Sequence, residues 1–172
     1  PGANGLLLLP YFAGERTPIA DPRARGVLNG LTLKHGLGDV YRAALEGIAF
    51  GVRHNIDEIR RWGGDVRRVT AVGGGTQARL WLSIVSDVTG LPQILRAQSI
   101  GASYGSAFLA AGLVTSVELD KWNPVKEVVH PDAGLTDFYS SRFPAYRSLY
   151  DVSADLMHLL ADGPSASRTH DR

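Results

Sequence analysis

The sequence predicts an α/β fold in which parallel strands alternate with helices. Two units of strand, turn and helix follow each other between residues 66 and 112, and glycine occurs in the turn of each unit. A long helical pattern precedes them, over residues 39–62. Consecutive units of this kind place their strands side by side and parallel, with a right-handed crossover. Ligands bind such sheets beyond the carboxyl ends of the strands.

Length and composition describe an ordinary globular chain. With 172 residues, of which 44% are hydrophobic and 20% charged, it forms one domain or part of one. Its net charge of +1 gives no reason to expect a nucleic acid or a membrane as partner. The basic pairs are scattered and are interpreted as solvated faces or local ion pairs: Arg23/Arg25, Arg60/Arg61 and Arg67/Arg68.

The chain contains no cysteine, which excludes disulfides, thiolate metal sites and thiol catalysis. No apolar run approaches the ~20 residues that span a bilayer. Residues 6–9 are also too short an apolar run for a signal peptide. These features predict a cytoplasmic protein.

The N-terminal part predicts two short strands joined by a shaped loop. Residues 6–9 are four leucines, which predict a buried strand that Pro10 ends. Residues 10–26 contain three prolines and two glycines and therefore predict a loop. Residues 26–32 predict the second strand, in which Gly30 marks a bulge or a close approach. Opposite charges in the loop favour ion pairs that hold it: Glu15, Arg16, Asp21, Arg23 and Arg25.

Residues 39–62 predict the longest helix. Asp39 is the expected N-cap, and Gly63-Gly64 end the helix. We interpret Glu46 as a solvated carboxylate rather than a catalytic one, and His54 as a surface or partly packed histidine. The expected buried face consists of apolar residues at intervals of three and four: Tyr41, Leu45, Ile48, Val52, Ile56 and Ile59.

Residues 66–72 predict a strand, residues 76–89 a helix, and Gly73-Gly74-Gly75 the turn between them. Adjacent glycines leave backbone N–H groups uncovered and allow a positive φ. The helix directs its unpaired N–H groups and the positive end of its dipole at the same point. The pattern predicts an anion site, usually for phosphate. A tight turn without a ligand is an equal alternative on these residues alone, because neither Gly-x-Gly-x-x-Gly nor a Walker sequence is present.

The second segment of strand, turn and helix repeats this arrangement with smaller residues. Residues 91–95 predict a short strand, and Pro92 indicates that this strand begins at the edge of the ladder. The helix that follows Gly101 is rich in small residues, which permits close packing on the sheet and lets a ligand lie near its start. Both Gly73–Gly75 and Gly101 fall beyond the carboxyl ends of the predicted parallel strands, where ligands bind.

The C-terminal third is predicted to be a loop, a helix and a tail. Residues 123–136 are expected to be irregular. Residues 137–161 predict a helix that Pro144 breaks or restarts. Its aromatic residues are interpreted as core packing rather than cofactor contacts. Residues 163–172 are polar and are expected to form a flexible tail.

Four motifs, in order, resemble the C-terminal part of the FGGY carbohydrate kinases. Residues 26–46 resemble the C-terminal signature of that family. The loop at residues 10–26 resembles the loop before it, in the form seen in xylulokinase-like and gluconokinase-like members. Residues 73–81 resemble the adenosine-phosphate motif, and residues 101–107 resemble the small-residue helix after it. The resemblance covers about residues 5–115.

The resemblance implies a ribonuclease H-like, actin-like ATPase fold and ATP-dependent phosphorylation of a sugar or polyol hydroxyl. It implies that residues 1–162 form the C-terminal, nucleotide-binding lobe, which works with an upstream kinase lobe. D-xylulose is the expected sugar because of the Gly-Glu-Arg-Thr-Pro loop, and gluconate, ribulose and related polyols remain open. The implied nucleotide contacts are Gly73, Gly74, Gly75, Thr76, Ala78, Arg79 and Gly101. The implied structural loop of the cleft contains Glu15, Arg16, Asp21 and Arg25.

The resemblance leaves three matters open. Ala78 stands where the family often has Ser or Asn near the adenine, so the adenine contacts are not fixed. The catalytic aspartate and the carboxylates that hold Mg²⁺ precede the matching stretch in the family, so we assign no catalytic or metal-binding residue here. Gly38-Asp39 looks like the context of that aspartate but falls inside the later signature. A homodimer is also left open.

The sequence supports two functions to different degrees. The first is the nucleotide-binding half of a sugar kinase, inactive on its own. The alternative is a non-catalytic nucleotide-binding module of the same fold. An NAD-type oxidoreductase is poorly supported because no Gly-x-Gly-x-x-Gly opens a helix.

Overall fold

The two strands predicted near the N-terminus are present, and they pair as an antiparallel ladder. The computed structural model describes residues 1–99 and 101–161. A short 3₁₀ segment, η1 (Gly2–Gly5), leads into β1 (Leu7–Leu9), and β1 pairs with β2 (Val27–Asn29). Leu8 and Leu9 are buried, which confirms the predicted buried strand.

Gly30 marks a close approach, one of the two predicted possibilities. Its φ is +90°, and a Cβ on it would lie 2.8 Å from the carbonyl oxygen of Gly5. The chain can therefore fold back over η1 only where no side chain is present.

The long helix α1 (Leu37–Arg61) begins two residues before Asp39, so the predicted N-cap is wrong. Asp39 is the third residue of the helix, and its carboxylate accepts the N–H of Gly36 at 2.8 Å. This is the return half of a capping box, which a carboxylate at the third position makes. Gly63 has a φ of +88° and ends the helix as predicted.

The buried face of α1 differs from the predicted one. Tyr41, Ile48 and Ile59 are exposed, whereas Ala43 and Gly47 are buried. The reason is that β1 crosses the helix closely: a Cβ on Gly47 would overlap the carbonyl oxygen of Leu8. Close packing of a strand on a helix selects small residues rather than large apolar ones.

Helix α5 (Ala133–Ala161) is continuous through Pro144, so the predicted break is wrong. Phe143 and Tyr146, on either side of Pro144, are buried. Their packing, together with that of Tyr139, outweighs the backbone hydrogen bond that proline cannot make. The aromatic residues therefore belong to the core, as predicted.

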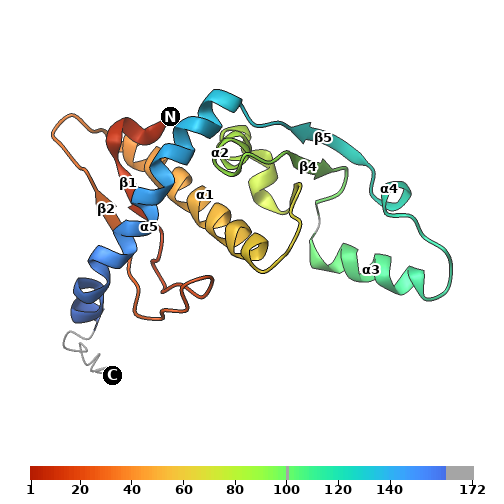
Figure 1. Cartoon of the computed structure of the whole chain (residues 1–172). Helices are drawn as coiled ribbons and strands as arrows, with labels where there is room; N and C mark the ends of the chain where they lie inside the picture. The colour runs from red at the N-terminus through yellow and green to blue at the C-terminus, as the bar shows by residue number, and fades with distance from the viewer. Residues whose placement is uncertain (100, 162–172) are drawn as a thin grey trace, which may run out of the picture. The chain divides into compact units, whose positions relative to one another are not determined.

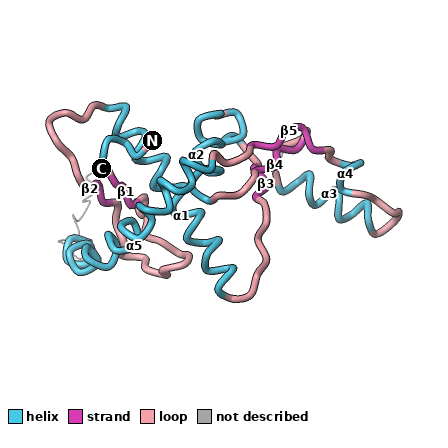
Figure 2. The backbone as a smooth tube through the Cα atoms, turned by 45° about the horizontal axis from the view of Figure 1, so that its top comes forward, coloured by secondary structure: helices cyan, strands magenta, loops and turns pink. Residues whose placement is uncertain are grey.

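A three-stranded sheet contains the predicted parallel pair. Strand β3 (Val69–Ala71) is parallel to β4 (Gln93–Arg96), and helix α2 (Arg79–Thr89) connects them after the 3₁₀ turn η2 (Gly74–Gln77). Gly90 closes α2 in the left-handed conformation, with φ +67°. The order of strands is β3-β4-β5, and the short strands are drawn in magenta in Figure 2.

The region predicted to be irregular, residues 123–136, contains a strand and the first residues of α5. Helix α3 (Ala102–Gly112) is followed by α4 (Leu119–Trp122) and by β5 (Val125–Val129), which is antiparallel to β4. The two prolines that suggested a loop lie outside β5. Leu82, Leu95 and Val129 form a buried cluster where α2 covers this sheet.

The chain divides into two compact units. One comprises Pro1–Ile48 together with the chain from Arg142 on, and the other comprises Ala49–Ser141. Helices α1 and α5, labelled in Figure 1, each contribute residues to both units. The predicted tail, residues 163–172, lies outside the described residues. Among those that are described, no helix is long and apolar enough to cross a membrane.

Candidate nucleotide-binding site

Two glycines with positive φ stand beyond the carboxyl ends of the parallel strands. Gly73 follows β3 by two residues and has a φ of +80°, and Gly101 precedes α3 with a φ of +89°. A Cβ on Gly73, Gly74 or Gly101 would meet no described residue within 4 Å. The backbone at this edge of the sheet is therefore open, as the sequence predicts for an anion site.

The glycine turn is a 3₁₀ turn, and α2 begins later than predicted. The first residue of α2 is Arg79, with Ala78 as its N-cap, rather than Thr76. Gly75 therefore does not stand directly before the helix. The Thr76 hydroxyl donates to the carbonyl oxygen of Gly73 at 2.8 Å, so this side chain holds the turn in shape.

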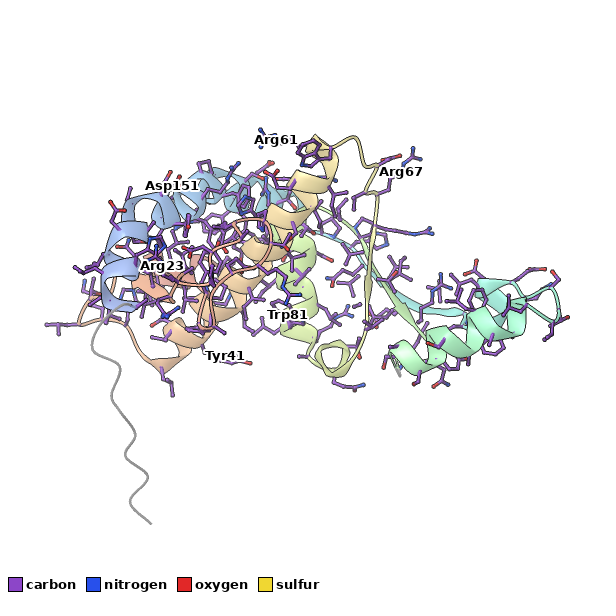
Figure 3. All side chains as sticks on the ribbon, turned by 90° about the horizontal axis from the view of Figure 1, so that it is seen from below. Arg23, Tyr41, Arg61, Arg67, Trp81 and Asp151 are labelled. Carbon is purple, nitrogen blue, oxygen red and sulfur yellow. The ribbon has the colours of Figure 1, made fainter. Side chains whose placement is uncertain are left out.

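Gly75 faces the indole of Trp81 rather than open space. A Cβ on Gly75 would lie 3.2 Å from Cδ1 and Nε1 of Trp81, a residue labelled in Figure 3. A side chain at Gly75 would crowd Trp81, whereas a Cβ at Gly74 would crowd none of the described residues.

Arg79 makes an ion pair with Glu127 of β5. Both side chains are exposed, so the pair contributes little to stability and can be exchanged for another anion. The predicted role of Arg79 in binding phosphate would require this exchange.

A cavity of about 300 Å³ lies in the second unit. Of the predicted nucleotide contacts, only Gly101 lines it. The sequence analysis missed the aromatic wall, Tyr104, Phe108 and Trp122. The rings of Tyr104 and Trp122 lie 5.6 Å apart, and the Tyr104 hydroxyl donates to the Trp122 carbonyl oxygen at 2.9 Å.

The polar wall of this cavity is cross-linked by hydrogen bonds. Arg96 pairs with Asp120 and donates to the carbonyl oxygen of Asn123 at 2.8 Å. The Asn123 side chain exchanges two hydrogen bonds of 2.9 Å with the backbone of Gln98. In the described part of the chain, the buried Nε1–H of Trp122 has no hydrogen-bond partner. In the sequence, Tyr104 and Phe108 are four residues apart, a spacing that places both rings on one face of a helix. This spacing could have indicated the aromatic wall.

The predicted loop residues lie in the first unit, and a contact with α5 holds the loop. Asp21 is buried, and its Oδ2 accepts hydrogen bonds from His158 Nε2 at 2.6 Å and from the Tyr150 hydroxyl at 2.9 Å. The hydrogen bond from His158 is the main cause that lowers the pKa of Asp21 to about 2, against the effect of burial. Burial first, and Asp21 second, raise the pKa of Tyr150 to about 12.

Hydrogen bonds to backbone groups connect other residues of the loop. Glu15 and Asp21 are joined through their backbones, by hydrogen bonds of 2.9 and 2.7 Å. The Arg25 guanidinium donates to the carbonyl oxygens of Pro22 and Ala24, at 3.2 and 2.8 Å. Arg16 is exposed at the tip of the loop.

Glu46 is buried, which corrects its interpretation as a solvated carboxylate. It accepts the N–H of Gly2 at 2.8 Å and pairs with Arg42 at 2.7 Å, so it fixes the N-terminal segment to α1. His54 is also buried rather than exposed.

Basic residues of the second unit make local ion pairs, which is one of the two predicted interpretations. Arg60 lies 3.7 Å from Asp57, Arg61 lies 3.6 Å from Glu58, and Arg67 pairs with Asp65. Over residues 1–99 and 101–161, no three His, Asp or Glu side chains converge as a metal site.

Comparisons with known proteins identify relatives over most of the chain. A family model described as the FGGY family of carbohydrate kinases, C-terminal domain, matches residues 1–113. Xylulose kinase of Staphylococcus epidermidis is 36% identical over 166 residues, which cover 91% of this chain and 33% of that protein. Gluconokinase of Bacillus subtilis is 31% identical, over 93% of this chain and 31% of that protein.

Solved structures show the same similarity. Xylulose kinase from Rhodospirillum rubrum matches with a TM-score of 0.80 and 33% identity, over 91% of this chain and 32% of that one. Ligand-bound xylulose kinase from Lactobacillus acidophilus matches with a TM-score of 0.83 at 24% identity, which supports the fold alone. The chain spans about a third of the length of these relatives.

Proposed function

The chain belongs to the FGGY family of carbohydrate kinases and has its actin-like ATPase fold, and we propose that the whole protein phosphorylates a sugar or polyol hydroxyl with ATP. Residues 1–162 would serve as its C-terminal, nucleotide-binding lobe. The observation that carries this proposal is the open glycine backbone at Gly73, Gly74 and Gly101, at the carboxyl edge of the parallel pair.

The proposed role of this chain is to hold the nucleotide. The N–H groups of Gly73 and Gly74 would donate hydrogen bonds to phosphate oxygens, and Gly101 would let the phosphates approach the start of α3. Thr76 would keep the turn in shape through its bond to Gly73, and Arg79 would exchange Glu127 for phosphate. Ala78 and Gly75 would border the site without donating a side chain.

The chemistry of transfer requires further groups. Phosphoryl transfer needs the γ-phosphate, a divalent cation and a positioned acceptor hydroxyl in line. Mg²⁺ would neutralise the phosphate charge, and we place its ligands and the catalytic base in the rest of the protein. No residue of this chain is assigned to either task.

A pentulose is the proposed acceptor, with D-xylulose first. Support comes from the relatives named xylulose kinase, at 36% identity in Staphylococcus epidermidis and 35% in Bacillus subtilis. Gluconate is the competing acceptor, because a relative named gluconokinase is 31% identical.

A coupled assay of ADP release by the whole protein tests the proposal. We expect turnover with D-xylulose that exceeds turnover with gluconate, ribulose or glycerol. Nucleotide binding without turnover on any of the four would instead support the alternative, a non-catalytic nucleotide-binding module. Absence of both binding and turnover would overturn the proposed function.

A further inference from the structure

A loop of the first unit surrounds a hollow whose wall carries both charges. The hollow measures about 590 Å³ and is lined by Ala13, Gly14, Glu15, Arg16, Ala20 and Pro22. A carboxylate accepts hydrogen bonds and a guanidinium donates them. A polyhydroxylated molecule offers donors and acceptors on adjacent atoms, so its chemistry matches this pair.

The loop has a shape that it could not hold alone. Gly14 has a φ of +80°, and a Cβ on it would lie 2.8 Å from the carbonyl oxygen of Pro22. Ala20 has a φ of +58°, which is unfavourable for a residue with a Cβ. Such a conformation persists only where surrounding structure imposes it.

The support for the loop comes from α5. Asp21 closes the loop through its two backbone hydrogen bonds with Glu15. Its side chain accepts from His158 Nε2 at 2.6 Å and from the Tyr150 hydroxyl at 2.9 Å. Its second oxygen accepts the N–H of Arg23 at 2.9 Å, so both oxygens of the carboxylate are engaged.

We propose that His158 and Tyr150 are positioning residues for the acceptor sugar, which act through Asp21 to hold Glu15 and Arg16 in a sugar-binding shape. This inference rests on the proposed kinase function. Neither His158 nor Tyr150 lines the hollow among the described residues, and therefore each acts through the loop.

Kinetics of variants in the whole protein test this role. Tyr150→Phe removes only a hydroxyl, and His158→Leu replaces the imidazole donor with an apolar side chain of similar bulk. We expect the KM for the sugar to rise about fivefold or more in each, since hydrogen bonds to a charged group are lost. The KM for ATP should stay within about twofold, because the glycine site lies elsewhere in the chain. His158→Gln, whose amide can still donate, should restore most of the sugar affinity.

Matched controls change the same residue types at exposed positions. Tyr41→Phe alters an exposed tyrosine of α1, and His130→Leu alters an exposed histidine after β5. Both should leave the KM for sugar and for ATP unchanged.

Hydrogen exchange provides a readout that is local to the loop. The N–H groups of Glu15 and Asp21 are bonded within the loop, so peptides that cover residues 13–22 should exchange slowly in the wild type. Tyr150→Phe and His158→Leu should accelerate their exchange by more than the fall in each variant's unfolding midpoint accounts for. Bound sugar should slow it again.

The outcomes separate this inference from the proposed function. A wild-type protein that phosphorylates no sugar overturns the proposed function and the sugar assignment with it. An active wild type with the same sugar KM in Tyr150→Phe and His158→Leu overturns the positioning role alone. A rise confined to the KM for ATP assigns the loop to the nucleotide and also overturns the inference.

Discussion

At the scale of single residues, two neighbouring glycines of the turn, Gly74 and Gly75, have different surroundings. Gly74 faces open space, whereas Gly75 faces the indole of Trp81. The same substitution at these two positions should therefore have different consequences, one for binding and the other for folding.

We predict that Gly74→Val weakens ATP binding by the whole protein by roughly ten- to a hundredfold, with little change in its melting temperature. The reason is that the valine side chain would occupy the open space of the phosphate and so prevent a backbone hydrogen bond to it. Such a bond to a charged phosphate is worth about 1.5–3 kcal/mol. Calorimetric titration of ATP, alongside a melting curve, measures both effects.

Gly75→Val should lower the melting temperature, since its Cβ meets the Trp81 ring at 3.2 Å. Gly38→Val, at an open position of α1, serves as the control for substitution itself. An unchanged ATP dissociation constant in a folded Gly74→Val protein would remove the main support for the phosphate site.

Asp21 gives a prediction about the pH dependence of stability. Its folded pKa, about 2, lies below the ordinary value of 3.8, so the folded state favours the charged carboxylate. Its contribution to stability is therefore complete above pH 3.8 and is lost as the pH falls toward 2. We expect the difference in unfolding free energy between wild type and Asp21→Asn to be constant from pH 7 to about 5 and to shrink as the pH falls below that range.

Urea unfolding of both proteins across this range checks the prediction. Asp65→Asn, at an exposed carboxylate, supplies the comparison. A difference that grows on acidification would contradict the assigned hydrogen bonds of Asp21.

At the scale of elements, the contact between β1 and α1 decides which face of the helix is buried. Alanine normally stabilises a helix over glycine by about 0.5–1 kcal/mol. At Gly47 a Cβ would overlap the Leu8 carbonyl oxygen, so we predict that Gly47→Ala destabilises the protein by about 1–3 kcal/mol.

Gly38→Ala is the matched control in the same helix, because a Cβ there meets no atom within 4 Å in residues 1–99 and 101–161. It should be neutral or slightly stabilising. Chemical denaturation of both variants measures the change in the free energy of unfolding, which should be negative for Gly47→Ala and zero or positive for Gly38→Ala. Equal changes would show that contact with β1 does not exclude a side chain at Gly47.

At the scale of the whole molecule, large apolar side chains remain exposed. Leu113 and Val114 at the end of α3, and Leu159 and Leu160 near the end of α5, are each at least 70% exposed. Exposed apolar surface of this extent marks interaction surfaces or promotes aggregation. The chain also spans only about a third of its relatives.

We therefore predict that residues 1–172, expressed alone, self-associate and release no ADP with D-xylulose or gluconate. Sedimentation and the coupled assay measure these two properties, with the whole protein as the positive control. A monomer with cooperative unfolding, or turnover above a heat-treated sample, would contradict the prediction.

The sequence by itself determined the parts of this protein that depend on local pattern. Periodicity of apolar residues predicted α1, α2 and β1, and glycines predicted where helices end. Strand, turn and helix in succession predicted the parallel pair β3–β4, with its open glycine edge, because the crossover rule fixes topology from element order. The order of four motifs was enough to indicate the family.

Only the tertiary structure decided which residues meet. Glu46 is buried against the N–H of Gly2, which is 44 residues away in the sequence. The lowered pKa of Asp21 depends on His158, which is 137 residues away. The start of α2 at Arg79 and the position of Gly75 against the Trp81 ring were also seen only in the structure. No local pattern encodes such pairs, because the free energy of a buried polar group depends on the partner that the fold brings to it.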